Sequence, residues 1–351
     1  MESINIISSL QTLVQKYCSK EDLSEFLYKH RCFYLLERID EGTLKQKIIL
    51  QKELNEQIVR ERYRQCKEVF YALNNKVKYA NIKGAMLSLA AYGNAAYRFS
   101  ADIDILIDRN QTASVKEILS RHGFVQGKIV QSAIKPYSRE ELLFYSAFSH
   151  QMAPFVKKTE SQLCPFIIFD INTDIMWGES FLQVDMNFVL SNITATIFCD
   201  VPMYKLDNEM CFISLCLHHY KDMNSIYILA KKQLQLSYFC DIYFYYVNNP
   251  LSISRLLAMC NKLGVSEYIY YCVYYTYQIF HDKRLFIFLE NFEPTYAPEI
   301  IHTFGLSKNE IKLWTIDFYE RVFGDLHSYL EKRLTQEDWY KIEQNSRYIS
   351  G

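Results

Sequence analysis

The stretch from Asn81 to Asp108, NIKGAMLSLAAYGNAAYRFSADIDILID, is the most informative part of this chain. Its pattern predicts a strand, a turn at Gly84, a helix, a loop and a second strand that carries Asp102 and Asp104. Because side chains alternate along a strand, the two carboxylates are expected on one face. Two negative charges so near each other are unfavourable unless a cation neutralises them, and carboxylate oxygens are suitable ligands for Mg²⁺. The stretch therefore predicts a cation site on a strand.

The regions around this stretch extend the alternation of strands and helices. Apolar runs predict strands, and helical spacing predicts helices between them, which together indicate an α/β unit. After Pro202 the pattern becomes helical. The expected strands are 79–83, 101–107, 124–130 and 166–172, and the expected helices include 85–92, 111–122, 207–218 and 229–246.

Two helical regions flank the predicted α/β unit. The segment 44–73 is expected to be one long helix, and its alternating acidic and basic residues predict a solvated face. The aromatic stretch 268–280 is expected to be a buried helix, and polar turns are expected at 19–22 and 293–294. The predicted division is an N-terminal helical segment (1–76), a core (77–205) and a C-terminal helical domain (206–351).

Composition limits the classes of function. The 351 residues are 50% hydrophobic and 23% charged, which is typical of a globular protein with a sizeable core. The net charge of −1 gives no basic field to attract nucleic acid, which argues against a long polynucleotide but not against a small anion such as ATP.

The cysteines and the apolar runs bear on the compartment. Ten cysteines are scattered without a Cys-x-x-Cys pair, and the N-terminus lacks the features of a signal peptide. We therefore expect reduced, mostly buried thiols in a cytoplasmic protein. No apolar run reaches the roughly 18 residues that a membrane span needs, so no membrane partner is expected.

A family resemblance is carried by Lys83-Gly84-Ala85 and by the run Arg98-x-Ser100-x-Asp102-Ile103-Asp104-Ile105-Leu106-Ile107. This arrangement resembles the nucleotidyltransferase superfamily, and more narrowly the poorly characterised bacterial nucleotidyltransferase family proteins. The resemblance implies an α/β (α+β) fold, with a small mixed-sheet core between N-terminal and C-terminal helical segments. It also implies the transfer of a nucleoside monophosphate, such as AMP from ATP or another nucleoside triphosphate, to a hydroxyl of a small molecule, peptide or protein.

The resemblance also implies a set of acidic residues for two-metal chemistry with Mg²⁺ or Mn²⁺. Asp102 and Asp104 would bind the nucleotide-bearing ion, and Asp170 would hold the catalytic ion and take the acceptor's proton. Asp185 is a rival for the third position. Family members often have a histidine two residues after the third acid, and this chain has Asn172 there.

Four further residues are candidates for binding the triphosphate. Gly84 would let backbone N–H groups approach phosphate at a helix N-terminus, although the serine that follows this glycine in the superfamily is absent. Lys83 would supply charge, or be a surface lysine. Arg98 would pair with a phosphate or form a salt bridge with Asp102. Ser100 would contact a phosphate or orient the loop.

Two rival functions and one polar cluster remain. The missing serine and histidine leave open a non-catalytic descendant that binds or regulates, and the same two-metal logic with water as acceptor describes a phosphodiesterase. In the C-terminal helical region, His218 or His219 is expected to be a polar partner for Asp241 or for the substrate.

Overall fold

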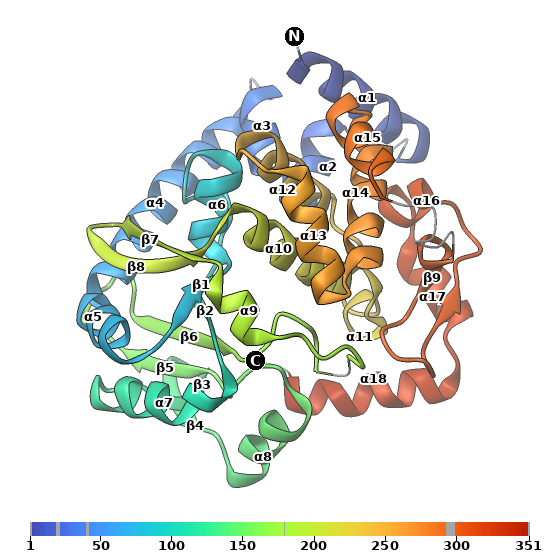
Figure 1. Cartoon of the computed structure of the whole chain (residues 1–351). Coiled ribbons are helices and arrows are strands. Elements are labelled where there is room, and N and C mark those ends of the chain that lie inside the picture. The colour runs from blue at the N-terminus through green and yellow to red at the C-terminus, as the bar shows by residue number, and fades with distance from the viewer. Residues whose placement is uncertain (1, 19–21, 40–41, 179, 293–298, 350–351) are drawn as a thin grey trace. The chain divides into compact units, whose positions relative to one another are not determined.

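The computed structural model describes residues 2–18, 22–39, 42–178, 180–292 and 299–349. The turns expected at 19–21 and 293–294 lie outside these ranges, whereas Asp22 caps a helix by accepting a hydrogen bond from the Glu25 N–H. The chain forms two compact units, which we call the sheet unit (Gln51–Leu215 with Asn249–Leu251) and the helix-rich unit (Met1–Leu50, Cys216–Asn248 and Ser252–Ile349). Figure 1 labels the elements of both. The division of the chain at residues 76 and 205 stays a prediction.

The sheet unit contains the stretch 81–108 together with elements that precede it and elements that follow it in the chain. Helices α4 (Thr43–Gln65) and α10 (Asn208–Asn224) each begin in one unit and end in the other. The remaining elements are α5 (Lys67–Lys76), β1 (Tyr79–Asn81), α6 (Gly84–Tyr92), β2 (Asp102–Ile107), η1 (Arg109–Gln111), α7 (Thr112–Arg121), β3 (Val125–Val130), β4 (Ala133–Pro136), α8 (Arg139–Phe148), β5 (Phe155–Lys158), β6 (Phe166–Asn172), α9 (Met186–Ser191), β7 (Ile193–Phe198) and β8 (Val201–Leu206).

These strands form one mixed eight-stranded sheet in the order β4-β3-β5-β6-β2-β1-β8-β7. The pairs β2–β6 and β1–β8 are parallel, and the other neighbours are antiparallel. The expected α/β class is therefore confirmed, as are the strands predicted around residues 80, 104, 127 and 169. The prediction of a helix directly after Pro202 is wrong, because Val201–Leu206 pairs with Ile193–Phe198 and buries Val201 and Met203 in the core.

Helices α4, α5 and α7 contribute to the core on one face of the sheet (Figure 1). Ile103, Ile105 and Ile107 of β2 point into this core and are almost completely buried. The long helix predicted for 44–73 is wrong in one respect, because it is interrupted at Cys66, where α4 ends and α5 begins. Strand alternation then places the side chains of Asp102 and Asp104 on the opposite face of β2.

The helix-rich unit is built from short helices with an aromatic core. Strand-like pairing in it is confined, among described residues, to a two-stranded ribbon. The helix expected at 268–280 is confirmed as α14, with its inward side chains buried. Its elements are α1 (Glu2–Tyr17), α2 (Leu23–Lys29), α3 (Phe33–Ile39), α11 (Ile226–Leu229), α12 (Leu236–Asn248), α13 (Ile253–Leu263), α14 (Ser266–Phe280), α15 (Lys283–Glu290), η2 (Ile300–His302), β9 (Thr303–Phe304), β10 (Lys312–Leu313), α16 (Phe318–Phe323), α17 (Leu326–Arg333) and α18 (Gln336–Ile349).

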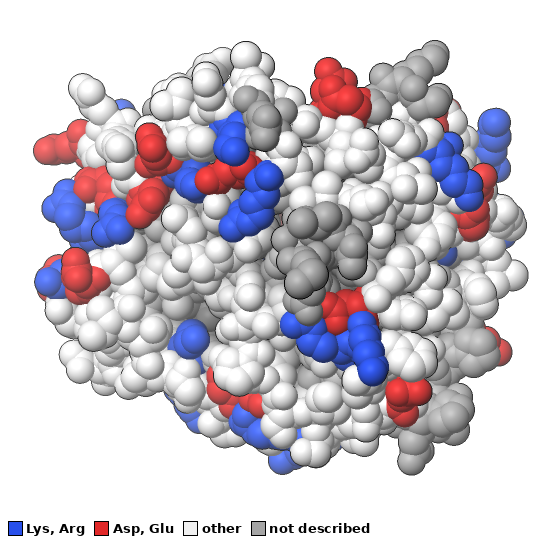
Figure 2. Space-filling view, turned by 90° about the horizontal axis from the view of Figure 1, so that it is seen from above, with Lys and Arg blue, Asp and Glu red and all other residues white. Residues whose placement is uncertain are grey.

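The cysteines and the distribution of surface charge can be compared with what the composition predicted. All ten cysteines are free thiols, and seven of them are buried. Acidic and basic side chains alternate on the face shown in Figure 2, without a broad patch of one sign. In the described part of the chain, every helix is too short or too polar to cross a bilayer.

Candidate active site

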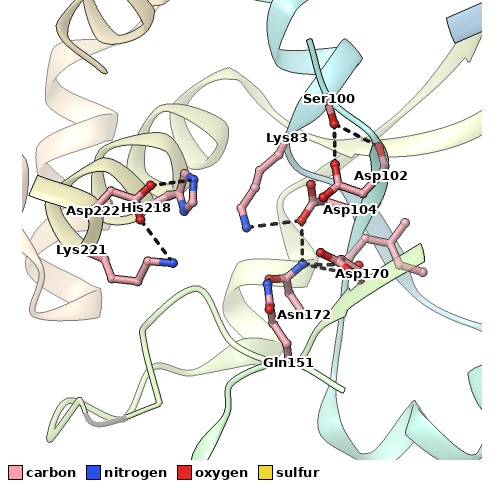
Figure 3. A network of polar contacts seen from close by, with 11 residues as sticks. Lys83, Ser100, Asp102, Asp104, Gln151, Asp170, Asn172, His218, Lys221 and Asp222 are labelled. Atoms are coloured by element: carbon pink, nitrogen blue, oxygen red, sulfur yellow. Dashed lines mark hydrogen bonds and ion pairs between the residues drawn. The ribbon is translucent and has the colours of Figure 1, made fainter. Parts of the chain in front are cut away.

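Two parallel strands bring the predicted acids together on the face of the sheet opposite the core that α4, α5 and α7 share. In the register of β2 and β6, Asp104 lies directly opposite Asp170. Asp102 precedes Asp104 by two residues and therefore shares its face. Figure 3 shows the three carboxylates directed toward one another. The sheet register thus produces an acidic cluster from residues that are 66 positions apart in the chain.

Asp104 is the most deeply buried acid of the cluster, with 8% of its surface exposed. Its Oδ1 accepts hydrogen bonds from Lys83 Nζ and from Asn172 Nδ2, each at 3.3 Å. Burial raises the pKa of Asp104 above its ordinary value, the ammonium of Lys83 opposes this shift, and the charge of Asp102 adds to it. Lys83 therefore supplies the positive charge that this carboxylate faces.

Asp170 is partly exposed as a residue, but its Oδ1 is buried and has no hydrogen-bond partner among the described residues. Burial raises the pKa of Asp170 well above its usual range, and the charges of Asp104 and Asp102 raise it further. A buried carboxylate oxygen without a donor is costly unless a proton or a cation reaches it. The site therefore contains an unsatisfied acceptor between like charges.

This donor set has the chemistry that Mg²⁺ or Mn²⁺ prefers, because three carboxylates present hard oxygen ligands. The orphaned Asp170 oxygen supports the same fit. In the described ranges, however, no three His, Cys, Asp or Glu side chains are already arranged as ligands of one ion. Instead, Ser100 Oγ donates to Asp102 Oδ1 at 2.5 Å, and Lys83 holds Asp104. Ligation by all three acids requires these side-chain contacts to be exchanged.

The glycine turn before α6 packs tightly against the loop that leads into β2. Gly84 has a φ of +58°, and a Cβ atom there would lie 3.0 Å from Ser100 Oγ. Arg62, which is 5% exposed, donates from its Nη1 to the Ser100 carbonyl at 2.8 Å. The loop that carries Ser100 is therefore fixed from two sides, by a glycine and by a buried guanidinium.

We expect Gly84→Ala to lower the free energy of unfolding by about 2–3 kcal/mol, since it adds a clash to the ~1–2 kcal/mol of a left-handed non-glycine residue. Gly93→Ala is the matched control, because Gly93 has a φ of +72° but no atom within 4 Å of a Cβ. It should show the backbone term alone in urea unfolding. Equal losses for both variants would contradict a close approach at Gly84.

The backbone around Arg98 is held by two residues that sequence reasoning missed. Asn55, which is buried in α4, donates to the carbonyls of Ala96 and Arg98 at 2.9 and 3.4 Å. Ser88 Oγ accepts a hydrogen bond from the Arg98 N–H at 3.1 Å. The choice between phosphate and Asp102 as the partner of the Arg98 guanidinium stays a prediction.

Asn172 stands where relatives in the resembled family often have histidine, and it joins the acids to Gln151 in the segment between α8 and β5. Its Oδ1 accepts a hydrogen bond from Gln151 Nε2 at 2.7 Å, and its Nδ2 contacts Asp104. Asn172 is 1% exposed. An uncharged amide at this position can donate to a carboxylate without titrating, which a histidine cannot do over the same pH range.

The remaining predicted polar residues lie in other surroundings. Asp185 Oδ1 accepts hydrogen bonds from the N–H groups of Asn187 and Phe188 and so caps α9. In the helix-rich unit, His219 Nε2 lies 3.0 Å from Asp241 Oδ2, and both residues are buried. The expected partnership of a histidine with Asp241 is therefore confirmed for His219.

A mixed sheet that gathers three acids on two neighbouring parallel strands, beside a glycine turn, places this chain in the α/β class. A family profile described as "Uncharacterised nucleotidyltransferase" matches residues 11–281, and the chain belongs to this family. The resemblance inferred from the sequence is thereby confirmed. Comparisons with curated proteins and with solved structures gave no match.

Proposed function

We propose that this nucleotidyltransferase is metal-dependent and moves a nucleoside monophosphate, AMP from ATP, onto an acceptor hydroxyl. The observation that carries the proposal is the pairing of Asp104 with Asp170 in register, with one buried Asp170 oxygen left unsatisfied. Like-charged carboxylates at this spacing are unfavourable in isolation, so their gathering on one face supports a role in cation binding.

In this proposal Asp102 and Asp104 hold the ion that carries the nucleotide, and Asp170 contributes to a second. Bound Mg²⁺ or Mn²⁺ neutralises charge that develops on the phosphate oxygens. The Asp170 carboxylate accepts the proton of the acceptor hydroxyl, whose oxygen then bonds to the α-phosphorus. The bond from that phosphorus to the bridging oxygen breaks, and pyrophosphate leaves with the electron pair. Without an ion, burial and the neighbouring acids raise the pKa of Asp170; bound Mg²⁺ or Mn²⁺ would keep this carboxylate ionised, so that it can accept the proton.

The triphosphate would be bound by the residues around the glycine turn. Backbone N–H groups at the start of α6, where Gly84 permits close approach, favour an anion. Lys83 begins as the partner of Asp104, and we propose that it moves to the phosphates when the nucleotide and its ion arrive. Arg98 and Ser100 complete the predicted contacts on the loop before β2.

One observation favours a second candidate function, a nucleotide-binding or regulatory protein without turnover. Two of the acids are already partnered within the protein, Asp104 by Lys83 and Asn172, and Asp102 by Ser100. A site satisfied in this way does not depend on an ion for its stability. The unpartnered oxygen of Asp170 argues for the catalytic alternative.

The test uses full-length protein, α-labelled nucleoside triphosphates with Mg²⁺ or Mn²⁺, and a panel of hydroxyl acceptors. We expect label transfer by the wild type and a loss of at least about 100-fold for Asp104→Asn. Asp108→Asn is the control, since Asp108 lies just beyond β2 and caps η1, which asparagine also does.

Three outcomes separate the alternatives. Transfer that depends on Asp104 but not on Asp108 supports the proposal. Ion-dependent nucleotide binding, read as a rise in the unfolding midpoint with a non-hydrolysable ATP analogue, but no turnover with any acceptor, supports the regulatory protein. Release of free nucleoside monophosphate to water supports a phosphodiesterase and contradicts the proposed transfer.

A further inference from the structure

A cavity of about 310 Å³ lies in the sheet unit, next to the positions where β2 and β6 end. Arg109 follows β2 and Thr173 follows β6, and both line it. Leu142 and Met152 supply apolar wall, while Gln151 and Tyr145 add polar groups. Small-molecule sites combine such a mainly apolar wall with a few convergent polar groups, from about 300 Å³ upward. The cavity therefore has room for one small compound, not for a folded segment of a protein.

The cavity is positively charged. Arg109 and Lys116 both line it, and no described carboxylate does. Neither cation forms an ion pair with a described residue. Asp174 lies outside the lining. Burial raises the pKa of Asp174 above its ordinary value, and the positive charge of Arg109 opposes part of this rise. In a chain with nearly equal numbers of acidic and basic residues, a pocket lined by two cations and no acid selects anions.

The cavity is connected to the acidic cluster by a short chain of contacts. Gln151 lines the cavity and donates to Asn172, which in turn contacts Asp104. Tyr145 also lines the cavity, and its ring lies 5.5 Å from that of Tyr137. The pKa of Tyr137 is raised mainly by burial, and also by the charge of Asp170. The three acids do not line the cavity, and the printed contacts join it to them through Gln151 and Asn172.

We propose that this cavity binds the acceptor, and that the acceptor is a small alcohol that carries a phosphate or carboxylate group. The inference rests on the proposed nucleotidyl transfer, and it narrows the acceptor from a small molecule, peptide or protein to the first of these. Arg109 and Lys116 hold the acidic group, because charge-assisted hydrogen bonds to guanidinium and ammonium groups favour both anions. The hydroxyl then lies on the Gln151 side, toward Asp170.

The experiment measures binding directly and so does not depend on turnover. Inorganic phosphate, glycerol 3-phosphate, D-glycerate and glycerol are titrated into full-length protein by calorimetry. We expect one or both acidic alcohols to bind at least tenfold more tightly than glycerol, and the comparison between them identifies the acidic group. Arg109→Gln/Lys116→Gln should weaken that binding at least tenfold, about 1.4 kcal/mol. Both side chains are exposed, so this variant should fold.

Arg121→Gln is the matched control, because Arg121 lies on the same helix α7, is exposed and pairs with Glu117 outside the cavity. It should bind as the wild type does. The inference is overturned if no probe binds, if glycerol binds as tightly as the acidic alcohols, or if Arg121→Gln weakens binding as much as the double variant.

The same measurements separate this inference from the proposed function. Asp104→Asn should keep anion binding in the cavity while it loses label transfer. Anion binding that depends on Arg109 and Lys116, in a wild type that never transfers label, would overturn the proposed function and leave the cavity as an anion site. Label transfer without anion binding would overturn the cavity and leave the proposed function intact.

Discussion

Asp170→Asn should make the ion-free protein more stable while it lowers nucleotidyl transfer by about 10²–10⁴-fold. The loss follows from removing the group that accepts the acceptor's proton. The gain in stability follows from the surroundings of Asp170, since its pKa is raised by burial and by two neighbouring acids. Most substitutions of buried residues destabilise a protein, so a gain here reports specifically on the acidic cluster.

The sign of the effect depends on pH. Because the folded state raises the pKa of Asp170, the folded protein binds this proton more tightly than the unfolded chain does. Wild-type stability is therefore favoured below the ordinary pKa near 4, and this advantage is lost as pH rises through the folded pKa. Asparagine does not titrate. The variant should gain on the order of 1–3 kcal/mol over the wild type near neutral pH, and little at pH 4.

Unfolding midpoints from pH 4 to 8, without divalent ions and then with Mg²⁺, measure this difference. Mg²⁺ at 100 times its dissociation constant should stabilise the wild type by about 2.7 kcal/mol and should have much less effect on the variant. Asp185→Asn is the control, because asparagine also caps a helix and Asp185 is the rival third acid. If Asp185→Asn abolishes transfer and Asp170→Asn does not, the roles given to the two acids are reversed.

The shared face of Asp102 and Asp104 was predictable from sequence because strand alternation is a local rule, whereas Asp170 was proposed from the family resemblance. Ile103 and Ile105 alternate with Asp102 and Asp104, so the burial of the isoleucines in the core places the two acids on the opposite face of the strand. Gly84 was predictable for a similar reason, since a glycine between a strand and a helix indicates either a special φ or a close approach. At this position the structure shows both.

The partners of the acids were not predictable, because they depend on which segments meet. Arg62 belongs to a helix with alternating charges, which predicted a solvated face, yet it is buried beneath the Ser100 loop. Its position next to Val59 and Tyr63, which lie on the core side of α4, was the available signal. The β7–β8 strands failed in prediction for the same reason, since their pairing with each other outweighs the weak local pattern.

His30 gives the second large effect, an acid lability of the helix-rich unit. The His30 side chain is completely buried, its Nδ1 accepts a hydrogen bond from the Leu236 N–H at 3.1 Å, and its ring stacks on Phe26 at 4.0 Å. Its Nε2 has no partner among the described residues. If the ring were protonated, its Nδ1 could no longer accept the hydrogen bond from the Leu236 N–H, and a positive charge would be buried. Burial accordingly lowers the pKa of His30 from 6.5 to about 3, and Lys29 adds to the shift.

The folded protein therefore holds His30 neutral at pH values where the unfolded chain binds a proton. Stability from this group is fully present above pH 6.5 and is lost as pH falls toward 3, by about 1.4 kcal/mol for each pH unit. The total reaches on the order of 4–5 kcal/mol, which is comparable with the whole stability of a marginal domain. His30→Asn places an amide oxygen near the Nδ1 position and removes the titration.

The measurement compares unfolding midpoints of the wild type and His30→Asn between pH 7.5 and 4. The variant should be less stable at pH 7.5, by about 1–3 kcal/mol for the lost ring packing, and should lose less stability as the pH falls, so that the two curves converge and then cross. His327→Asn is the control, since the side chain of His327 is 62% exposed and should leave the pH dependence unchanged. Parallel curves for the wild type and His30→Asn would show that another group sets the acid limit.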